Sequence, residues 1–312
     1  MEVMTATSGW CFGIKRAYQM MQGTALEAEG RPVFAAHRCT STHANDDLDT
    51  LRRIEAEDQR LLQSYPGLGR VTVVHDVSQL KIGDRLLLGY HGLPDDEKAG
   101  LSARGISVSD YQCPFIANLN KKVEMLAKDG FNIIFVGKNQ NHHCLHAKKV
   151  AERYGRECFV IEKPADLEAF PSVHGGEWAL VGQVTGNTLL WDAVVRWNEG
   201  AKKARIVQPT VCTDSYDRQQ EAINLARQAE ATVLVDDGGA ASTSLYEVIA
   251  PAGKPVYRVR WREDGSWKTA IRGSWFAGVR SVAVVGGILI PDWAIEEMAN
   301  HIRSLKRSGA AQ

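Results

Sequence analysis

Residues 132–137 have the sequence NIIFVG, a short apolar run that ends in glycine. Residues 117–129, just before it, carry apolar side chains at the spacing of a helix. A continuous apolar run of this length, set between a helix and a glycine, is typical of a strand buried on both faces of a parallel sheet. This stretch predicts the α/β class.

The same alternation of short β-branched runs and longer helical patterns continues along the chain. Alternation of this kind predicts parallel sheets that are covered by helices on both faces. The other expected strands are 71–74, 85–89, 158–161, 178–182, 232–236, 255–259 and 281–286, and the other expected helices are 14–29, 192–203, 218–230 and 293–307.

Composition narrows the class of protein. The chain has 312 residues, of which 44% are hydrophobic and 24% charged, as in ordinary globular proteins. The 37 basic and 37 acidic side chains cancel, and no strongly basic run is present, so nucleic acid is not expected as a partner. No apolar run has the roughly 18 residues that a membrane span needs, and the N-terminus lacks a secretory pattern. We expect a cytoplasmic protein without membrane contact.

Three of the six cysteines share one local context. Cys11, Cys113 and Cys212 lie about a hundred residues apart, and each follows a short extended stretch and precedes a helical pattern. This repeat predicts three α/β lobes, at 13–111, at 112–206, and at 207–312 together with 1–12. The other three cysteines lack the context and are expected to fill space: Cys39, Cys144 and Cys158.

A cysteine between a strand and a helix is placed for metal chemistry. The backbone N–H groups and the positive end of the helix dipole lower the thiol pKa and favour the thiolate. Three such thiolates, brought together by three equivalent lobes, would hold three irons of a 4Fe-4S cubane and leave the fourth iron open, as catalytic metal sites require. The alternative is that each cysteine is a small buried hydrophobe.

Five stretches in chain order carry a family resemblance: 9–17 (GWCFGIKRA), 90–92 (YHG), 110–114 (DYQCP), 183–185 (QVT) and 212–219 (CTDSYDRQ). They resemble the motifs of the 4-hydroxy-3-methylbut-2-enyl diphosphate reductases, the LytB/IspH type. The resemblance implies a three-lobed trefoil around a 4Fe-4S cluster on Cys11, Cys113 and Cys212. It also implies that the unique iron binds a substrate hydroxyl, which is removed as water, and that reduced ferredoxin or flavodoxin supplies the electrons.

The resemblance also assigns pocket residues. His143 takes the position of the family's proton-relaying glutamate, and His91 and Thr185 match further pocket positions, so these three are the expected catalytic residues. Histidine exchanges protons near neutral pH. The expected substrate-binding residues are His91, Ser41, His43, His142, Gln183, Ser242 and Ser244.

The family's diphosphate cradle is altered in this chain. Ser41 stands where the family has a histidine, although His43 is two residues on. The serine and asparagine of a family loop align with Gly239 and Ala241, and a later serine aligns with Leu289. A diphosphate needs several donors at once. The sequence therefore predicts reductive dehydroxylation, or a related elimination, of a substrate without a diphosphate.

Three alternatives stay open. The chain is a genuine 4-hydroxy-3-methylbut-2-enyl diphosphate reductase if shifted residues such as His43, His142, Ser242 and Ser244 hold the diphosphate. It is a non-catalytic redox sensor or electron carrier if Cys144 or His143 closes the cluster. The dense group at 142–146 (HHCLH) also allows a zinc site, although a loop that lines the pocket is expected there.

Overall fold

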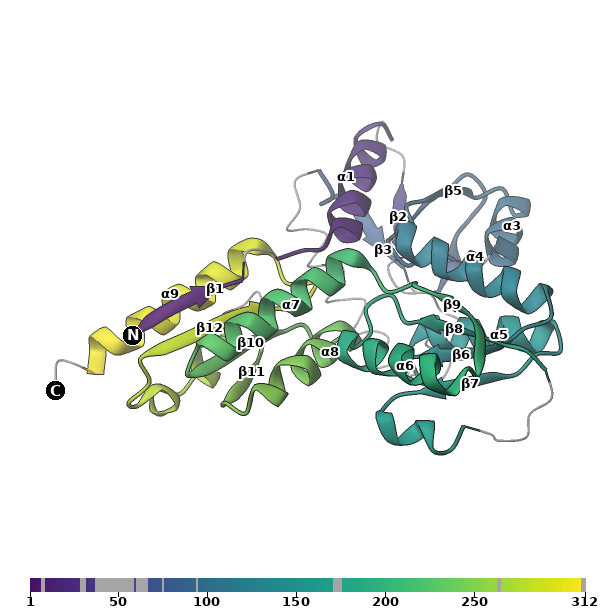
Figure 1. Ribbon diagram of the computed structural model, residues 1–312. Coiled ribbons are helices and arrows are strands. Elements are labelled where there is room, and N and C mark those ends of the chain that lie inside the picture. Colours follow the sequence, from purple (N-terminus) through teal and green to yellow (C-terminus); the bar gives the residue numbers. More distant parts are fainter. Residues whose placement is uncertain are drawn as a thin grey trace. The chain divides into compact units, whose positions relative to one another are not determined.

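The computed structural model describes residues 1–6, 9–28, 32–36, 59, 67–74, 76–93, 95–170, 176–262 and 265–309. This part of the chain contains three parallel four-stranded sheets with helices between the strands, which confirms the α/β prediction (Figure 1). The chain divides into two compact units, one made of residues 12–117 and the other of residues 1–11 and 118–312.

The unit of residues 12–117 holds one sheet, with strand order β3-β2-β4-β5. Leu86 and Leu88 of β4 are buried, and they form a cluster with Leu101 of α3 and Ile106, just before β5. The elements are α1 (Phe12–Leu26), β2 (Val33–Ala36), β3 (Val71–Val73), β4 (Arg85–Leu88), α3 (Asp95–Ala103), β5 (Ser107–Asp110) and the start of α4 (Pro114–Lys128).

The other unit holds two sheets. In the first of them the order is β7-β6-β8-β9, and all five residues of β6 and of β8 are buried, as expected for central parallel strands. The elements around it are β6 (Asn132–Val136), α5 (His142–Arg153), β7 (Cys158–Ile161), β8 (Trp178–Gly182), α6 (Thr188–Ala201) and β9 (Ala204–Gln208).

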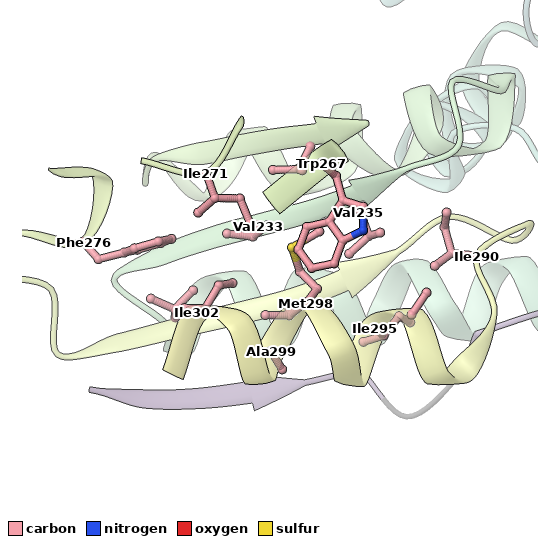
Figure 2. Close-up of a cluster of buried hydrophobic side chains, with 14 residues drawn as sticks. Val233, Val235, Trp267, Ile271, Phe276, Ile290, Ile295, Met298, Ala299 and Ile302 are labelled. Carbon is pink, nitrogen blue, oxygen red and sulfur yellow. The ribbon is translucent and has the colours of Figure 1, made fainter. Parts of the chain in front are cut away.

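The second sheet of this unit has the order β1-β12-β10-β11 and two apolar faces. Val233 and Val235 point to one face, where α9 packs with Met298 and Ile302, as Figure 2 shows. Leu234 belongs to the cluster on the other face, with side chains of α7 and α8, since neighbouring strand residues point to opposite sides. The elements are β1 (Glu2–Thr5), α7 (Thr213–Gln228), β10 (Ala231–Asp236), α8 (Ala240–Ile249), β11 (Val256–Arg260), β12 (Ser281–Gly286) and α9 (Asp292–Gly309).

The three sheets share one construction. Strands β1, β5 and β9 are edge strands, and each pairs in parallel with β12, β4 or β8, respectively. These edge strands are the extended stretches that precede the three predicted cysteines. The limits proposed for the lobes, at 111/112 and 206/207, stay predictions.

Among the described residues no helix is both long and apolar enough to cross a membrane. Helices α3, α5 and α8 were not expected from the sequence, and the expected loop at 142–146 is wrong, because α5 begins at His142. The side chain of Asn141 accepts a hydrogen bond from the His143 amide and caps this helix.

Candidate active site

Cys11, Cys113 and Cys212 each occupy the residue directly before a helix. Cys11 precedes α1, Cys113 precedes α4, and Cys212 is the N-cap of α7 with an extended backbone. Cys113 and Cys212 are buried and Cys11 is half-buried. Each cysteine therefore stands at the positive end of a helix dipole.

The same backbone hydrogen bond holds each of these cysteines. The amide N–H of Cys11 donates to the carbonyl of Ile288 (3.3 Å), that of Cys113 to Tyr90 (2.8 Å), and that of Cys212 to Val184 (2.9 Å). The three acceptors lie just after β12, β4 and β8, which are the neighbours of the edge strands that lead to the cysteines. We call this arrangement of edge strand, cysteine, helix and bonded loop the cysteine turn.

This donor set fits an iron-sulfur cluster. Thiolates are the usual ligands of such clusters, and the three cysteine turns offer three thiols in equivalent surroundings. Cys11 and Cys212 belong to one compact unit and Cys113 to the other. No described cysteine forms a disulfide.

The remaining described cysteines have different surroundings. Cys144 lies within α5 and is fully buried, and burial raises the pKa of its thiol to about 11. Cys158 begins β7, and burial raises the pKa of its thiol to about 12. Both stay protonated near neutral pH, in agreement with a space-filling role. Cys39 lies outside the described residues.

His91 lies in the turn after β4, next to the carbonyl that holds Cys113. Its ring contacts that of Tyr90, with the centroids 4.3 Å apart. Its own carbonyl accepts a hydrogen bond from Nε2 of Gln112 (2.8 Å). His91 is thus attached to the cysteine turn of Cys113, at the carboxyl end of a sheet strand, where parallel sheets place their ligands.

His142 and His143 occupy the first turn of α5. Their rings lie edge to face with centroids 4.0 Å apart. His143 is only 3% exposed, and burial, followed by the charges of His142 and His146, holds its pKa well below the usual value of 6.5. Its imidazole is therefore neutral at physiological pH.

Gln183 lies directly after β8 and beside the cysteine turn of Cys212. Its side chain is fully buried, and Oε1 accepts a hydrogen bond from the amide of Lys138 (2.9 Å). Nε2 has no hydrogen-bond partner among the described residues. A Cβ at Gly137 would lie 2.6 Å from Cβ of Gln183, so only glycine allows this close approach. Thr185, two residues on, is half-buried.

Asp237, in the loop before α8, bonds within this loop, to α8 and to the loop after β12. Oδ1 of Asp237 accepts hydrogen bonds from the hydroxyl of Ser242 (2.8 Å) and the amide of Gly239 (2.7 Å). Oδ2 of Asp237 accepts one from the amide of Leu289 (3.3 Å). A Cβ at Gly287 would lie 2.1 Å from Oγ of Ser242, so any other residue there would displace the side chains of this bonded group. The acidic side chain thus takes donors that a bound anion would use, a role of Asp237 that the sequence did not suggest.

Three predicted binding residues remain: Ser244, Ser41 and His43. Ser244 is buried within α8, and its hydroxyl has no partner among the residues that the structure describes. Ser41 and His43 lie outside the described residues.

Sequence comparison relates nearly the whole chain to one known protein family. A sequence model of the LytB protein family matches residues 3–303. The chain belongs to the LytB family. The LytB resemblance predicted from the motifs is therefore confirmed, and so is the prediction of an enzyme of the LytB type.

Curated LytB relatives are similar over nearly their full length. The 4-hydroxy-3-methylbut-2-enyl diphosphate reductase of Aquifex aeolicus is 22% identical, and the match covers 97% of this chain and 96% of the relative. The reductase of the same name from Anaeromyxobacter sp. (strain Fw109-5) is 27% identical, with 99% of each chain covered.

Solved structures agree on the LytB fold. The structure of the E-1-hydroxy-2-methyl-but-2-enyl-4-diphosphate reductase from Plasmodium falciparum matches with a TM-score of 0.74 at 14% identity. The match covers 96% of this chain and 87% of that one. A structure of (E)-4-hydroxy-3-methyl-but-2-enyl diphosphate reductase matches with a TM-score of 0.57 at 20% identity, over 97% of this chain and 100% of that one.

Proposed function

We propose that this LytB-family enzyme is a 4-hydroxy-3-methylbut-2-enyl diphosphate reductase that carries a 4Fe-4S cluster on Cys11, Cys113 and Cys212. The observation that carries the proposal is the cysteine turn, which recurs with the same amide hydrogen bond at all three cysteines. The names of the relatives favour this alternative over the expected substrate without a diphosphate. They also favour catalysis over a non-catalytic redox sensor or electron carrier.

When bound, such a cluster supplies electrons and a Lewis-acidic iron with an open position. Gln183 can then orient the substrate, because its buried Nε2 is a donor that lacks a partner among the described residues. A buried donor left without a partner is costly, so a ligand oxygen at this point stabilises the pocket. Thr185 follows the carboxyl end of β8, and His91 follows the carboxyl end of β4. Each offers a further polar group for the substrate.

The proton relay is assigned to His143. Because its imidazole is neutral, one ring nitrogen donates a proton while the other accepts one, so the ring passes protons without holding a lasting charge. His142 contacts this ring and is the proposed neighbour on the substrate side. Ser41, His43, Ser242 and Ser244 complete the proposed binding residues.

A second candidate is the substrate without a diphosphate that the altered cradle predicts. The contacts of Asp237 favour it, because its carboxylate accepts hydrogen bonds from Gly239, Ser242 and Leu289. A fixed carboxylate beside a diphosphate repels it unless one of the two moves. The two candidates differ in whether the substrate carries a diphosphate, and they can be separated by assay.

The deciding assay measures turnover of anaerobically purified protein with a chemical reductant. We expect conversion of 4-hydroxy-3-methylbut-2-enyl diphosphate, and rescue of a strain that lacks this activity. Gln183→Ala is expected to raise KM, whereas the exposed Arg205→Ala on β9 serves as the control. Turnover of the dephosphorylated alcohol without turnover of the diphosphate would favour the second candidate. Iron-loaded protein inactive on both would contradict a reductase of this class.

The environment and partners follow from the same proposal. Reduced ferredoxin or flavodoxin is the proposed electron donor, and the cytoplasm is the proposed location. The three lobes keep their proposed limits of 13–111, 112–206, and 207–312 with 1–12.

A further inference from the structure

An arginine connects the cysteine turn of Cys11 to the helix that follows Cys212. Nη2 of Arg218 donates to the carbonyl of Trp10 (3.0 Å), the residue directly before Cys11. Arg218 lies in the second turn of α7 and is only 8% exposed. Its Nε lies 3.7 Å from Oδ2 of Asp214, one turn earlier on the same helix. The guanidinium thus joins two segments that are more than 200 residues apart in the chain.

A second arginine makes the same contact at another cysteine. Nη1 of Arg16 donates to the carbonyl of Gln112 (3.3 Å), the residue directly before Cys113. Arg16 lies in the second turn of α1, the helix that follows Cys11. In both cases the helix after one cysteine carries the arginine that holds the peptide before another cysteine.

The segment before Cys11 is also held from its other side. The amide of Gly9 donates to Oδ1 of Asp292 (2.6 Å), and Nε1 of Trp10 donates to the carbonyl of Leu289 (3.0 Å). A Cβ at Gly9 would lie 2.2 Å from the backbone nitrogen of Asp292, so the segment packs tightly there. These contacts fix the segment to α9 and the loop after β12, whereas Arg218 fixes it to the helix of Cys212.

We propose that Arg218 and Arg16 are positioning residues: Arg218 sets the placement of Cys11 relative to the helix that follows Cys212, and Arg16 sets the placement of Cys113 relative to α1. The inference rests on the proposed cluster. Arginine suits this role because its guanidinium is planar, always charged and rigid, so a bonded carbonyl is held in direction as well as distance. Groups that orient metal ligands in this way commonly affect metal affinity by about 10- to 100-fold when they are removed.

The test compares iron retention in three variants of the reconstituted protein. Arg218→Met removes the donor and keeps most of the side-chain volume. Arg16→Met does the same at Cys113. Arg227→Met is the matched control, since Arg227 is exposed in the last turn of the same helix as Arg218. Each protein is loaded with iron and sulfide, and the readouts are the rate of iron release to a chelator and the EPR spectrum of the reduced cluster.

We expect Arg218→Met and Arg16→Met to release iron at least about tenfold faster than the parent, with a shifted EPR spectrum, and Arg227→Met to match the parent. Release at the parental rate with an unchanged spectrum in folded Arg218→Met would overturn the inference. If Arg218→Met does not fold, Arg16→Met decides in its place: it lacks the donor to the Gln112 carbonyl, so parental release with an unchanged spectrum there would overturn the inference. A parent that binds no iron would instead refute the proposed function.

Discussion

The cysteine turns and the region of α5 and β7 place cysteines in opposite surroundings. Cys11, Cys113 and Cys212 stand before helices, with their amides bonded to the loop of a neighbouring strand. Cys144 and Cys158 lie inside regular elements, where burial raises the pKa of their thiols to about 11 and about 12. The proposed ligands are thus set apart by their position at a helix start rather than by burial, since Cys113 and Cys212 are buried as well.

Substitution of single cysteines tests this comparison with the largest expected effect. Cys11→Ser, Cys113→Ser and Cys212→Ser should each lose most of the bound iron and all measurable turnover, because each removes one of the three proposed cluster ligands. Cys144→Ala and Cys158→Ala should keep the iron content of the parent. Iron and acid-labile sulfide analysis checks both groups, and iron loss in Cys144→Ala would remove the distinction between them.

The loop that holds Cys11 can be strained without touching a cysteine. Gly287→Ala places a Cβ 2.1 Å from Oγ of Ser242 and 2.5 Å from Oδ2 of Asp237, next to the Ile288 carbonyl that accepts the Cys11 amide. Overpacking of this kind should lower the free energy of unfolding by about 1–3 kcal/mol and loosen iron binding.

Gly200→Ala is the matched control for that substitution. Gly200 lies in α6 with nothing within 4 Å of its added Cβ, and alanine favours a helix interior, so a stability gain of up to about 1 kcal/mol is expected. Urea denaturation measures both variants. Equal stability of Gly287→Ala and the parent would show that the loop adapts freely.

Within α5, burial lowers the pKa of the His143 imidazole, whereas it raises the pKa of the Cys144 thiol. The pKa of His143 is held well below 6.5 by burial, so as the pH falls through 6.5 the unfolded state takes up a proton that the folded state does not yet bind. Stability should therefore fall as the pH drops from 7 towards 5, by at most about 1.4 kcal/mol per pH unit from this group. His143→Gln should flatten that slope in urea titrations, and an unchanged slope would show that His143 is accessible to protons in the fold.

Alkylation of the buried thiols of Cys144 and Cys158 in the folded protein is the smallest effect that we expect. At pH 8 the thiolate fractions of Cys144 and Cys158 should be about 10⁻³ and 10⁻⁴, given their raised pKa values of about 11 and about 12. Peptide mass analysis after a short treatment of the folded protein with iodoacetamide should find neither residue modified, whereas treatment in denaturant should modify both. Rapid modification of Cys158 in the folded protein would show that β7 opens readily.

The sequence indicated the sheets and the cysteine context for physical reasons. Buried parallel strands such as β6 and β8 need continuous apolar runs, and these are visible in the chain. Helices α5 and α8 were missed because their first turns are rich in histidine, alanine and serine rather than in an apolar pattern. Their helical state depends on tertiary packing, which a local pattern does not contain.

The connections within the site could not be predicted in the same way. The bond from the Cys11 amide to Ile288 depends on the pairing of β1 with β12. These two strands lie near opposite ends of the sequence, so no local pattern shows that they pair. The contacts of Arg218 and Asp237 likewise depend on which loops the folded sheets bring together. The motifs contained Arg218, and its place six residues after Cys212 was the available signal.

The proposed function requires that the three cysteine turns hold a cluster with one open iron. Its most direct test is the Mössbauer spectrum of anaerobically purified protein, recorded with and without 4-hydroxy-3-methylbut-2-enyl diphosphate. We expect four irons per chain, with one distinct iron whose signal changes when the substrate is added. Protein without iron, or a cluster whose irons are all equivalent and indifferent to the substrate, would contradict it.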